Sequence, residues 1–257
     1  MKLDESDVRD MVRLVGKVAV LPGGHVEKKH FLMTGLCKLI DADAWAWGFS
    51  CRRDPTKPQV YVSILKGGFT EQSFVKLLQA FEHPEMIELA AKFYIEFETK
   101  KVHLTRLRDQ ITEPERYAVS KAHLAWKAAD VGSLILSQRP LDERSASTIG
   151  IYRRYHREKF SARESRIAHI VLTEVPWLHE QGWPEDRGAT VPALSPRQRL
   201  TLNLLILGQG HKQVADRMKI SPHTLQGYIK AIYRHFSVHS QAELMHRFHE
   251  GNGRDVQ

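Results

Sequence analysis

Two Ser-Pro pairs, at 195–196 and 221–222, constrain the C-terminal part of this 257-residue sequence most strongly. Serine caps a helix because its hydroxyl accepts a hydrogen bond from a backbone N–H in the first turn. Proline is favoured directly after the cap because it has no N–H to leave unpaired. We therefore expect a helix to begin after each pair. A capping box at Ser240 and Glu243 predicts a further helix.

A short helix fits between the two Ser-Pro pairs. Gly208 ends the first helix, and 211–218 forms the short one, with Val214, Ala215 and Met218 facing inward. A tight turn through 219–220 then leads to the next helix. Two short helices joined by a brief turn are the helix-turn-helix arrangement, whose second helix enters the major groove of DNA.

The helix predicted to begin at Pro222 has one apolar face and one polar face that is expected to be exposed. Apolar residues recur at three- and four-residue steps, which is the spacing of a buried stripe: Leu225, Ile229, Ile232, Tyr233 and Phe236. The opposite face carries His223, Gln226, Gly227, Lys230 and Arg234. A glutamine can bond an adenine edge and a lysine a guanine edge. Arg234 lies further along, where a phosphate contact is expected.

Charge is concentrated in the same segment. Residues 194–249 hold eight Lys/Arg against two acids, which is six of the eight net positive charges of the chain. The eight cations are Arg197, Arg199, Lys212, Arg217, Lys219, Lys230, Arg234 and Arg247. This excess predicts an anionic partner.

Residues 194–245 resemble the C-terminal DNA-binding domain of the LuxR/GerE family of bacterial transcription regulators. The matching residues are LSPRQR at 194–199, Gly208, KQVADRMKIS at 212–221, Thr224-Leu225, Ile232 through Val238, Ser240 and Ala242. The resemblance implies a four-helix bundle that binds double-stranded DNA, forms a homodimer through its last helix and acts with RNA polymerase. It places Lys212 and Thr224 near phosphates, and Gln226, Gly227 and Lys230 near bases. Gln198, Gly210-His211 and Gln226-Gly227 depart from the usual pattern, which bears on the target sequence.

Residues 1–180 change hydrophobic period several times, which predicts an α+β domain. Helical patterns cover 6–20, 26–40, 70–81, 84–97 and 161–179, with a looser helical stretch at 111–129. Strand patterns cover 45–49, 59–65, 101–107, 133–138 and 147–152, with two hairpins. We expect a mixed or antiparallel sheet flanked by helices, similar in its order of elements to the GAF/PAS-like sensory domains of some LuxR-family proteins. Residues 181–193 are the expected linker, and 194–250 the DNA-binding domain.

Four aromatic residues on the first predicted hairpin have two open interpretations. Trp45, Trp47, Phe49 and Tyr61 can line a small-molecule pocket, or they can fill the core of the sheet. Asp54-Pro55 is present, but the surrounding spacing does not fit that of acyl-homoserine-lactone receptors. A small-molecule or protein effector is therefore expected without a predicted chemical identity.

Catalytic and metal-binding patterns are missing from the sequence. Its 14 histidines are not accompanied by cysteine or carboxylate clusters, and neither G-x-S-x-G nor G-x-x-x-x-G-K occurs. We expect no enzyme activity, cofactor or metal. No signal peptide or membrane span is apparent, so a cytoplasmic protein is expected. The competing interpretation is a small-molecule-binding or enzymatic α+β protein whose helical tail mediates protein contact.

Overall fold

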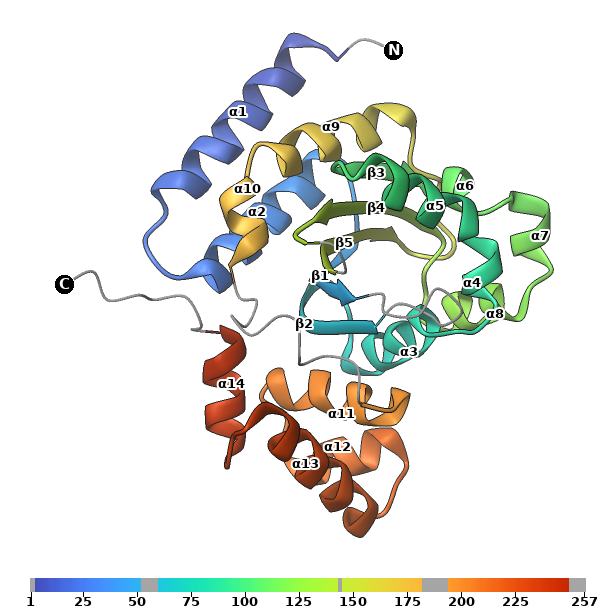
Figure 1. Cartoon of the computed structure of the whole chain (residues 1–257). Helices are drawn as coiled ribbons and strands as arrows, with labels where there is room; N and C mark the ends of the chain where they lie inside the picture. Colours follow the sequence, from blue (N-terminus) through green and yellow to red (C-terminus); the bar gives the residue numbers. More distant parts are fainter. Residues whose placement is uncertain (1–2, 52–59, 143–144, 182–193, 250–257) are drawn as a thin grey trace.

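A computed structural model describes residues 3–51, 60–142, 145–181 and 194–249 (Figure 1). The strands are β1 (Ala44–Cys51), β2 (Val60–Gly67), β3 (Leu104–Leu107), β4 (Ser133–Pro140) and β5 (Ser145–Arg153). The helices before residue 182 are α1 (Glu5–Val20), α2 (His25–Leu39), α3 (Glu71–Phe81), α4 (Met86–Leu89), α5 (Ala91–Lys100), α6 (Arg108–Ile111), α7 (Pro114–Ala118), α8 (Lys121–Ala128), α9 (Ala162–Thr173) and α10 (Pro176–Glu180). The C-terminal helices are α11 (Pro196–Ile206), α12 (His211–Met218), α13 (Pro222–Phe236) and α14 (Gln241–His249).

The strands form one five-stranded antiparallel sheet in the order β2-β1-β5-β4-β3. Both predicted hairpins are present, because β1 pairs with β2 and β4 pairs with β5. The expected α+β class is confirmed, and the sheet is antiparallel rather than mixed. The Asp54-Pro55 turn and nearly all of the expected linker, from residue 182 to 193, lie outside the described residues.

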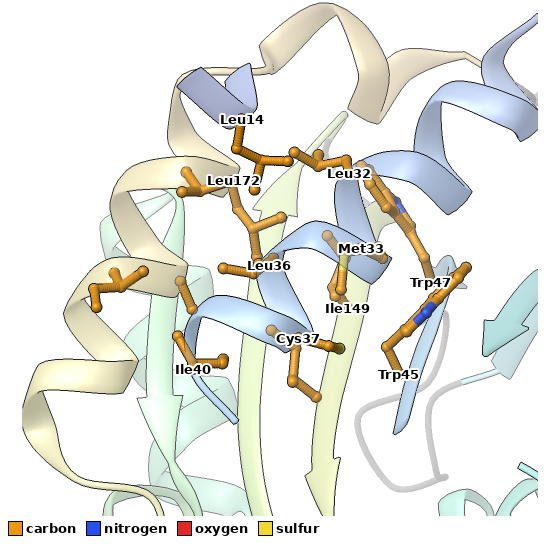
Figure 2. Packing of buried hydrophobic residues seen from close by; sticks show 14 of the residues in the cluster. Leu14, Leu32, Met33, Leu36, Cys37, Ile40, Trp45, Trp47, Ile149 and Leu172 are labelled. Carbon is orange, nitrogen blue, oxygen red and sulfur yellow. The ribbon is translucent and has the colours of Figure 1, made fainter. Parts of the chain in front are cut away.

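Helices cover both faces of the sheet (Figure 1). One face packs against α2 and α9, with α1 and α10 packed on these helices. Figure 2 shows the shared core, which includes Leu36 and Met33 of α2 and Ile149 of β5. Cys37 is a buried member of this cluster. The other face packs against helices α3 to α8, with Phe74, Leu77 and Phe93 buried there.

Capping residues account for where several helices begin. Thr70 accepts from the backbone N–H of Ser73 and starts α3, and Ser161 forms a capping box with Glu164 at the start of α9. The predicted helix 161–179 is wrong as a single element, because α9 ends at Thr173 and α10 begins at Pro176. Proline has no N–H for the helical ladder and disfavours helical torsions in the residue before it.

The prediction of one helix over 84–97 is also wrong. The structure has α4 and α5 with a break at Ala90, whose φ of −102° and ψ of 9° depart from helical values. That torsion turns the chain between the two helices. Both helices still contribute to one cluster, since Met86 and Phe93 are buried together. Among the described residues, no helix has the length and apolar character needed to cross a bilayer.

The four C-terminal helices share a core that is drawn from all of them. Leu205 of α11, Val214 of α12, Ile232 of α13 and Leu244 of α14 are fully buried together. The helix starts at 196, 211 and 222 agree with the predicted ones. Gly208 follows α11 with φ +78°, a left-handed conformation that favours glycine at a helix end.

Candidate nucleic-acid interface and effector cavity

A tight turn holds α12 and α13 in a fixed relation. Lys219 adopts the left-handed conformation, with φ 53° and ψ 49°, and the backbone N–H of Ile220 donates to the carbonyl of Ala215 over 3.1 Å. Ser221 then caps α13 by accepting from the backbone N–H of Thr224 over 3.1 Å. The two helices are thus joined by three residues, which is a helix-turn-helix connection.

The buried and exposed sides of α13 follow the spacing of the sequence. Leu225, Ile229, Ile232 and Phe236 are buried in the helical core. The proposed DNA-contacting residues of α13 are all exposed, and Lys212 at the start of α12 is exposed as well: His223, Thr224, Gln226, Gly227, Lys230 and Arg234. The structure therefore leaves this face of α13 free to enter a groove, and the contacts with DNA stay a prediction.

The exposed cations of this face are not neutralised. Within the described residues, Lys212, Lys230 and Arg234 have no ion-pair partner, whereas Arg217 on the other side of α12 pairs with Glu71 over 2.7 Å. Unpaired Lys and Arg side chains on one surface attract phosphate. The electrostatics of the interface thus match a polyanion.

Gly227 lies in the middle of α13 and faces solvent. A Cβ built on it would have no heavy atom within 4 Å. The packing of the domain therefore does not require glycine here, although glycine weakens a helix interior by about 0.5–1 kcal/mol relative to alanine. Glycine at this position is therefore not explained by contacts within the chain, which suggests that a binding partner requires it.

The sheet domain contains a cavity of about 50 Å³ on the face that packs against α3 to α8. It is lined by Ala46, Gly48, Tyr61, Ile64, Phe81, Met86, Ala90, Tyr94, Arg108, Ile111, Trp126, Leu134, Leu136, Thr148, Gly150 and Tyr152. Five of these are aromatic, and the ring centroids of Tyr61 and Phe81 are 4.9 Å apart. A Cβ on Gly150 would lie 1.8 Å from the Tyr152 hydroxyl, so this glycine makes room for the ring in the wall.

Only one of the four predicted ligand-binding residues borders this cavity. Tyr61 lines it, whereas Trp45, Trp47 and Phe49 project from the opposite face of β1. Their alternation with Ala46 and Gly48, which predicts the strand, also places the large and the small side chains on opposite faces. Small residues on one face of a strand leave space there, and the large aromatic residues fill the other face.

Arg108, Trp126 and Tyr152 are cavity residues that the sequence did not single out. Arg108 opens α6 and is 7% exposed, and Trp126 from α8 is 4% exposed. Both come from the stretch around 108–129, where the hydrophobic period is irregular because three short helices follow one another. An arginine such as Arg108 is ordinarily at the surface, so its burial was not expected from the sequence.

A polar network lies on the opposite face of the sheet. The ring centroid of His103 is 5.6 Å from that of His169 and 5.1 Å from that of His179. Burial is the main cause that lowers the pKa of His103 and of His179 to about 3, and of the buried Lys29 amine to about 7. The described residues include no group of three metal-ligating side chains placed to hold an ion.

A family model described as "Bacterial regulatory proteins, luxR family" matches residues 192–248. The C-terminal unit is a LuxR-family helix-turn-helix domain. The match includes all seven residues predicted to contact DNA and leaves out the sheet domain. No curated protein matches the chain.

Solved structures show weaker likeness. SdiA in complex with octanoyl-rac-glycerol is 13% identical, covers 96% of this chain and 96% of its own, and has a TM-score of 0.39. Escherichia coli SdiA in another crystal form is 13% identical, with coverages of 93% and 95% and a TM-score of 0.38. The VqsR LBD domain from Pseudomonas aeruginosa is 12% identical, with coverages of 68% and 94% and a TM-score of 0.45. At these TM-scores the likenesses carry no argument about ligand or activity.

The LuxR-family domain docks onto the sheet domain through α11, which packs on the edge strand β2 and on α3 (Figure 1). The Nδ2 of buried Asn203 donates to the backbone carbonyl of Tyr61 over 2.9 Å. Glu71 accepts from Gln209 and from Arg217, each over 2.7 Å. One strand residue, Tyr61, therefore has its side chain in the cavity wall and its backbone on the LuxR-family domain.

Proposed function

We propose that the chain is a sequence-specific DNA-binding transcription regulator of the LuxR type, whose N-terminal domain responds to a small-molecule or protein signal. The observation that carries the proposal is the exposed, unneutralised face of α13 within a segment that matches the LuxR-family model. A helix presented in this way fits the major groove.

In this proposal the exposed residues divide into two roles. Gln226, Gly227 and Lys230 meet base edges, with His223 beside them at the start of α13. Lys212, Thr224 and Arg234 meet phosphates, which position the domain without reading sequence.

The N-terminal domain supplies the response to a signal. The cavity of the sheet domain is the proposed effector site, and β2 is the proposed link to the LuxR-family domain. Tyr61 and Phe81 line both this cavity and a second hollow of about 280 Å³ that Leu200 and Asn203 of α11 also border. An effector that moved either aromatic ring would act directly on the docked helix.

Several finer features belong to the same proposal. The sheet domain is GAF/PAS-like, with boundaries at 1–180, 181–193 and 194–250 for sensor, linker and DNA-binding domain. The protein acts in the cytoplasm as a homodimer, paired through α14, and works with RNA polymerase. It has no enzymatic activity. Dimers of helix-turn-helix domains bind palindromic half-sites, which increases both affinity and specificity.

A selection of DNA sequences from a random pool, using the full chain, tests the proposal. We expect an enriched palindromic motif, and we expect Lys230→Ala to lose preference at a defined position of each half-site. Lys38→Ala is the matched control, because Lys38 is an exposed helical lysine in the sheet domain. Failure to enrich a motif, or the same motif from the Lys230 variant, would contradict the assignment.

The competing function is a small-molecule-binding or enzymatic α+β protein whose helical tail contacts another protein. The dependence of DNA affinity on salt separates the two. If several Lys and Arg side chains neutralise phosphates, the logarithm of the affinity falls linearly with the logarithm of salt concentration. An affinity for DNA that is weak and insensitive to salt would favour the competing function.

A further inference from the structure

The wall of the cavity holds three N–H groups that no described acceptor satisfies. They are Nε and Nη2 of Arg108 and Nε1 of Trp126. Both side chains are more than nine-tenths buried, and both line the cavity. Buried donors in folded proteins almost always have a hydrogen-bond partner. Three such donors in one wall define a site that lacks an acceptor.

Two aromatic rings lie against the Arg108 guanidinium. Its central carbon lies 4.6 Å from the ring centroid of Tyr117 and 4.3 Å from that of Trp126. Contacts of this kind use the flat faces of the guanidinium and leave its N–H edge free to donate. The edge of Arg108 is thereby preorganised for a planar acceptor.

The charge of Arg108 has no counter-ion among the described residues. Burial lowers the pKa of Arg108, and the neighbouring Tyr117, Tyr152 and Asp109 act in the opposite direction. Asp109 itself is exposed and pairs with Lys159 over 2.9 Å. A guanidinium keeps its charge in proteins, so the sheet domain carries a buried cation that an anion would stabilise.

Apart from the Tyr152 hydroxyl, the remaining polar groups of the wall already have partners. The Tyr61 hydroxyl is hydrogen-bonded with Tyr94, and Thr148 Oγ1 bonds with Ser50 and Gln138. The rest of the wall is aliphatic or aromatic. The cavity therefore offers an apolar volume with a cationic edge of N–H donors at Arg108 and Trp126.

We propose that this cavity binds a small organic carboxylate, with the carboxylate held by Arg108 and Trp126 and the apolar body among the aromatic rings. A carboxylate presents two oxygens in one plane, which matches two N–H groups of a guanidinium. The volume of about 50 Å³ restricts the apolar body to a chain of a few carbons. This inference rests on the proposed role of the domain as a sensor and names the chemical class of its signal.

A route to the site is present beside Arg108. The same residue borders a groove of about 290 Å³ that Tyr117, His123 and Tyr155 also line. Arg108 thus lies between the cavity and this groove, so an anion entering along the groove meets the guanidinium first.

Calorimetric titration of the full chain tests the proposal. The probes are acetate, propionate, butanoate and isobutanoate, each compared with its own neutral amide. We expect at least one acid to bind about tenfold or more tighter than its amide. The same acid is expected to change tryptophan fluorescence, because Trp126 forms part of the site.

Two variants assign the binding to the N–H donors. Arg108→Met replaces a buried charge by an apolar chain of similar length, which folded proteins tolerate. We expect this variant to keep its melting temperature and to lose the preference for acid over amide. Trp126→Phe keeps a ring and removes one donor, so binding of the acid should weaken several-fold. Arg106→Met is the control, since Arg106 pairs with Glu96 away from the cavity.

The outcomes separate this inference from the proposed function. Equal binding of acid and amide, binding by none of the four acids, or a preference that survives in Arg108→Met would overturn the carboxylate site. The selection of DNA sequences is scored independently on the same preparation. An enriched DNA motif without carboxylate binding would support the proposed regulator and contradict only the carboxylate ligand. Carboxylate binding without an enriched DNA motif would support the ligand site and contradict the regulator.

Discussion

At the scale of single residues, Gly227 links the stability of α13 to its function. Replacement by alanine meets no steric obstacle, so Gly227→Ala should raise the free energy of unfolding by about 0.5–1 kcal/mol. The same change should weaken DNA binding, because a methyl group is added to the face that we propose to enter the groove. Urea denaturation and a DNA titration measure the two effects.

The chain contains a matched control for this change. Gly16 is an exposed glycine inside α1, also with no heavy atom within 4 Å of an added Cβ. Gly16→Ala should raise stability by a similar amount and leave DNA affinity unchanged. Unaltered affinity in Gly227→Ala would show that glycine is not required for close approach.

The protonation state of His179 follows from its hydrogen bonds. Trp47 Nε1 donates to Ser147 Oγ over 2.9 Å, so the Ser147 hydroxyl is left to donate to His179 Nδ1 over 2.8 Å. Nε2 then carries the proton and donates to the carbonyl of Leu172 over 2.8 Å. This chain needs a neutral imidazole, which agrees with the low pKa that burial gives His179.

Stability should therefore fall as the pH drops below about 6.5. Unfolded histidines bind a proton near pH 6.5, whereas folded His103 and His179 do so only near pH 3, so acid favours the unfolded chain. Each histidine contributes a slope of up to about 1.4 kcal/mol per pH unit in this window. Urea denaturation between pH 7.5 and 5 measures it. His179→Gln should reduce the slope and the exposed control His156→Gln should not; a flat profile would count against the buried neutral histidines.

At the scale of elements, Ser221 decides how α13 begins. Ser221→Ala removes the acceptor of the Thr224 N–H and should cost about 1 kcal/mol of stability, with a matching loss of DNA affinity. Ser221→Asp restores a cap and should recover the stability, while its negative charge should keep DNA affinity low. Thermal unfolding and a DNA titration distinguish these effects. Equal stability of the alanine variant and the parent would mean that packing alone sets this helix end.

Element starts were the most predictable part of the fold, because a cap and a proline act within one turn. The helix starts at Pro196, at Pro222 and after Ser161 could be predicted, because each depends on residues within one turn. The breaks at Ala90 and before Pro176 were missed, since a hydrophobic stripe continues across each of them. The exposed face of α13 was predictable for the same reason as its buried face: one helical period determines both.

The cavity was less predictable than the helices. Its residues come from β1, β2, β4, β5 and the segment 81–126, and only the antiparallel order of the sheet brings them together. The aromatic residues at 45, 47 and 49 lie on the face of β1 opposite the cavity. Arg108 gave no local signal, because its burial depends on two rings that lie 9 and 18 positions further along the chain.

At the scale of the whole molecule, Glu71 ties the two units together. Burial works to raise its pKa, but the hydrogen bond and charge of Lys66, together with Arg217, hold the pKa of this carboxyl below its ordinary value. Glu71→Ala removes the acceptor of Gln209 and Arg217 and should loosen the docking of α11. We expect a larger radius of gyration in solution X-ray scattering, with a loss of stability below about 1 kcal/mol because the group is half exposed.

The control for this variant is Glu98→Ala, which removes an exposed glutamate of α5. If the two units respond to one another through the docked helix, Glu71→Ala should also reduce the effect of any effector on DNA affinity, and Glu98→Ala should not. Identical scattering profiles for both variants would show that Glu71 does not hold the units together.

The position of α11 has a consequence for how the protein stays dispersed. β2 is an edge strand, and the outward row of backbone groups on such a strand can pair with a strand of another molecule. Asn203 occupies one carbonyl of that row, and the body of α11 covers the strand. A sheet domain produced without the C-terminal helices would expose this edge and should self-associate, so the LuxR-family domain also protects its neighbour against aggregation.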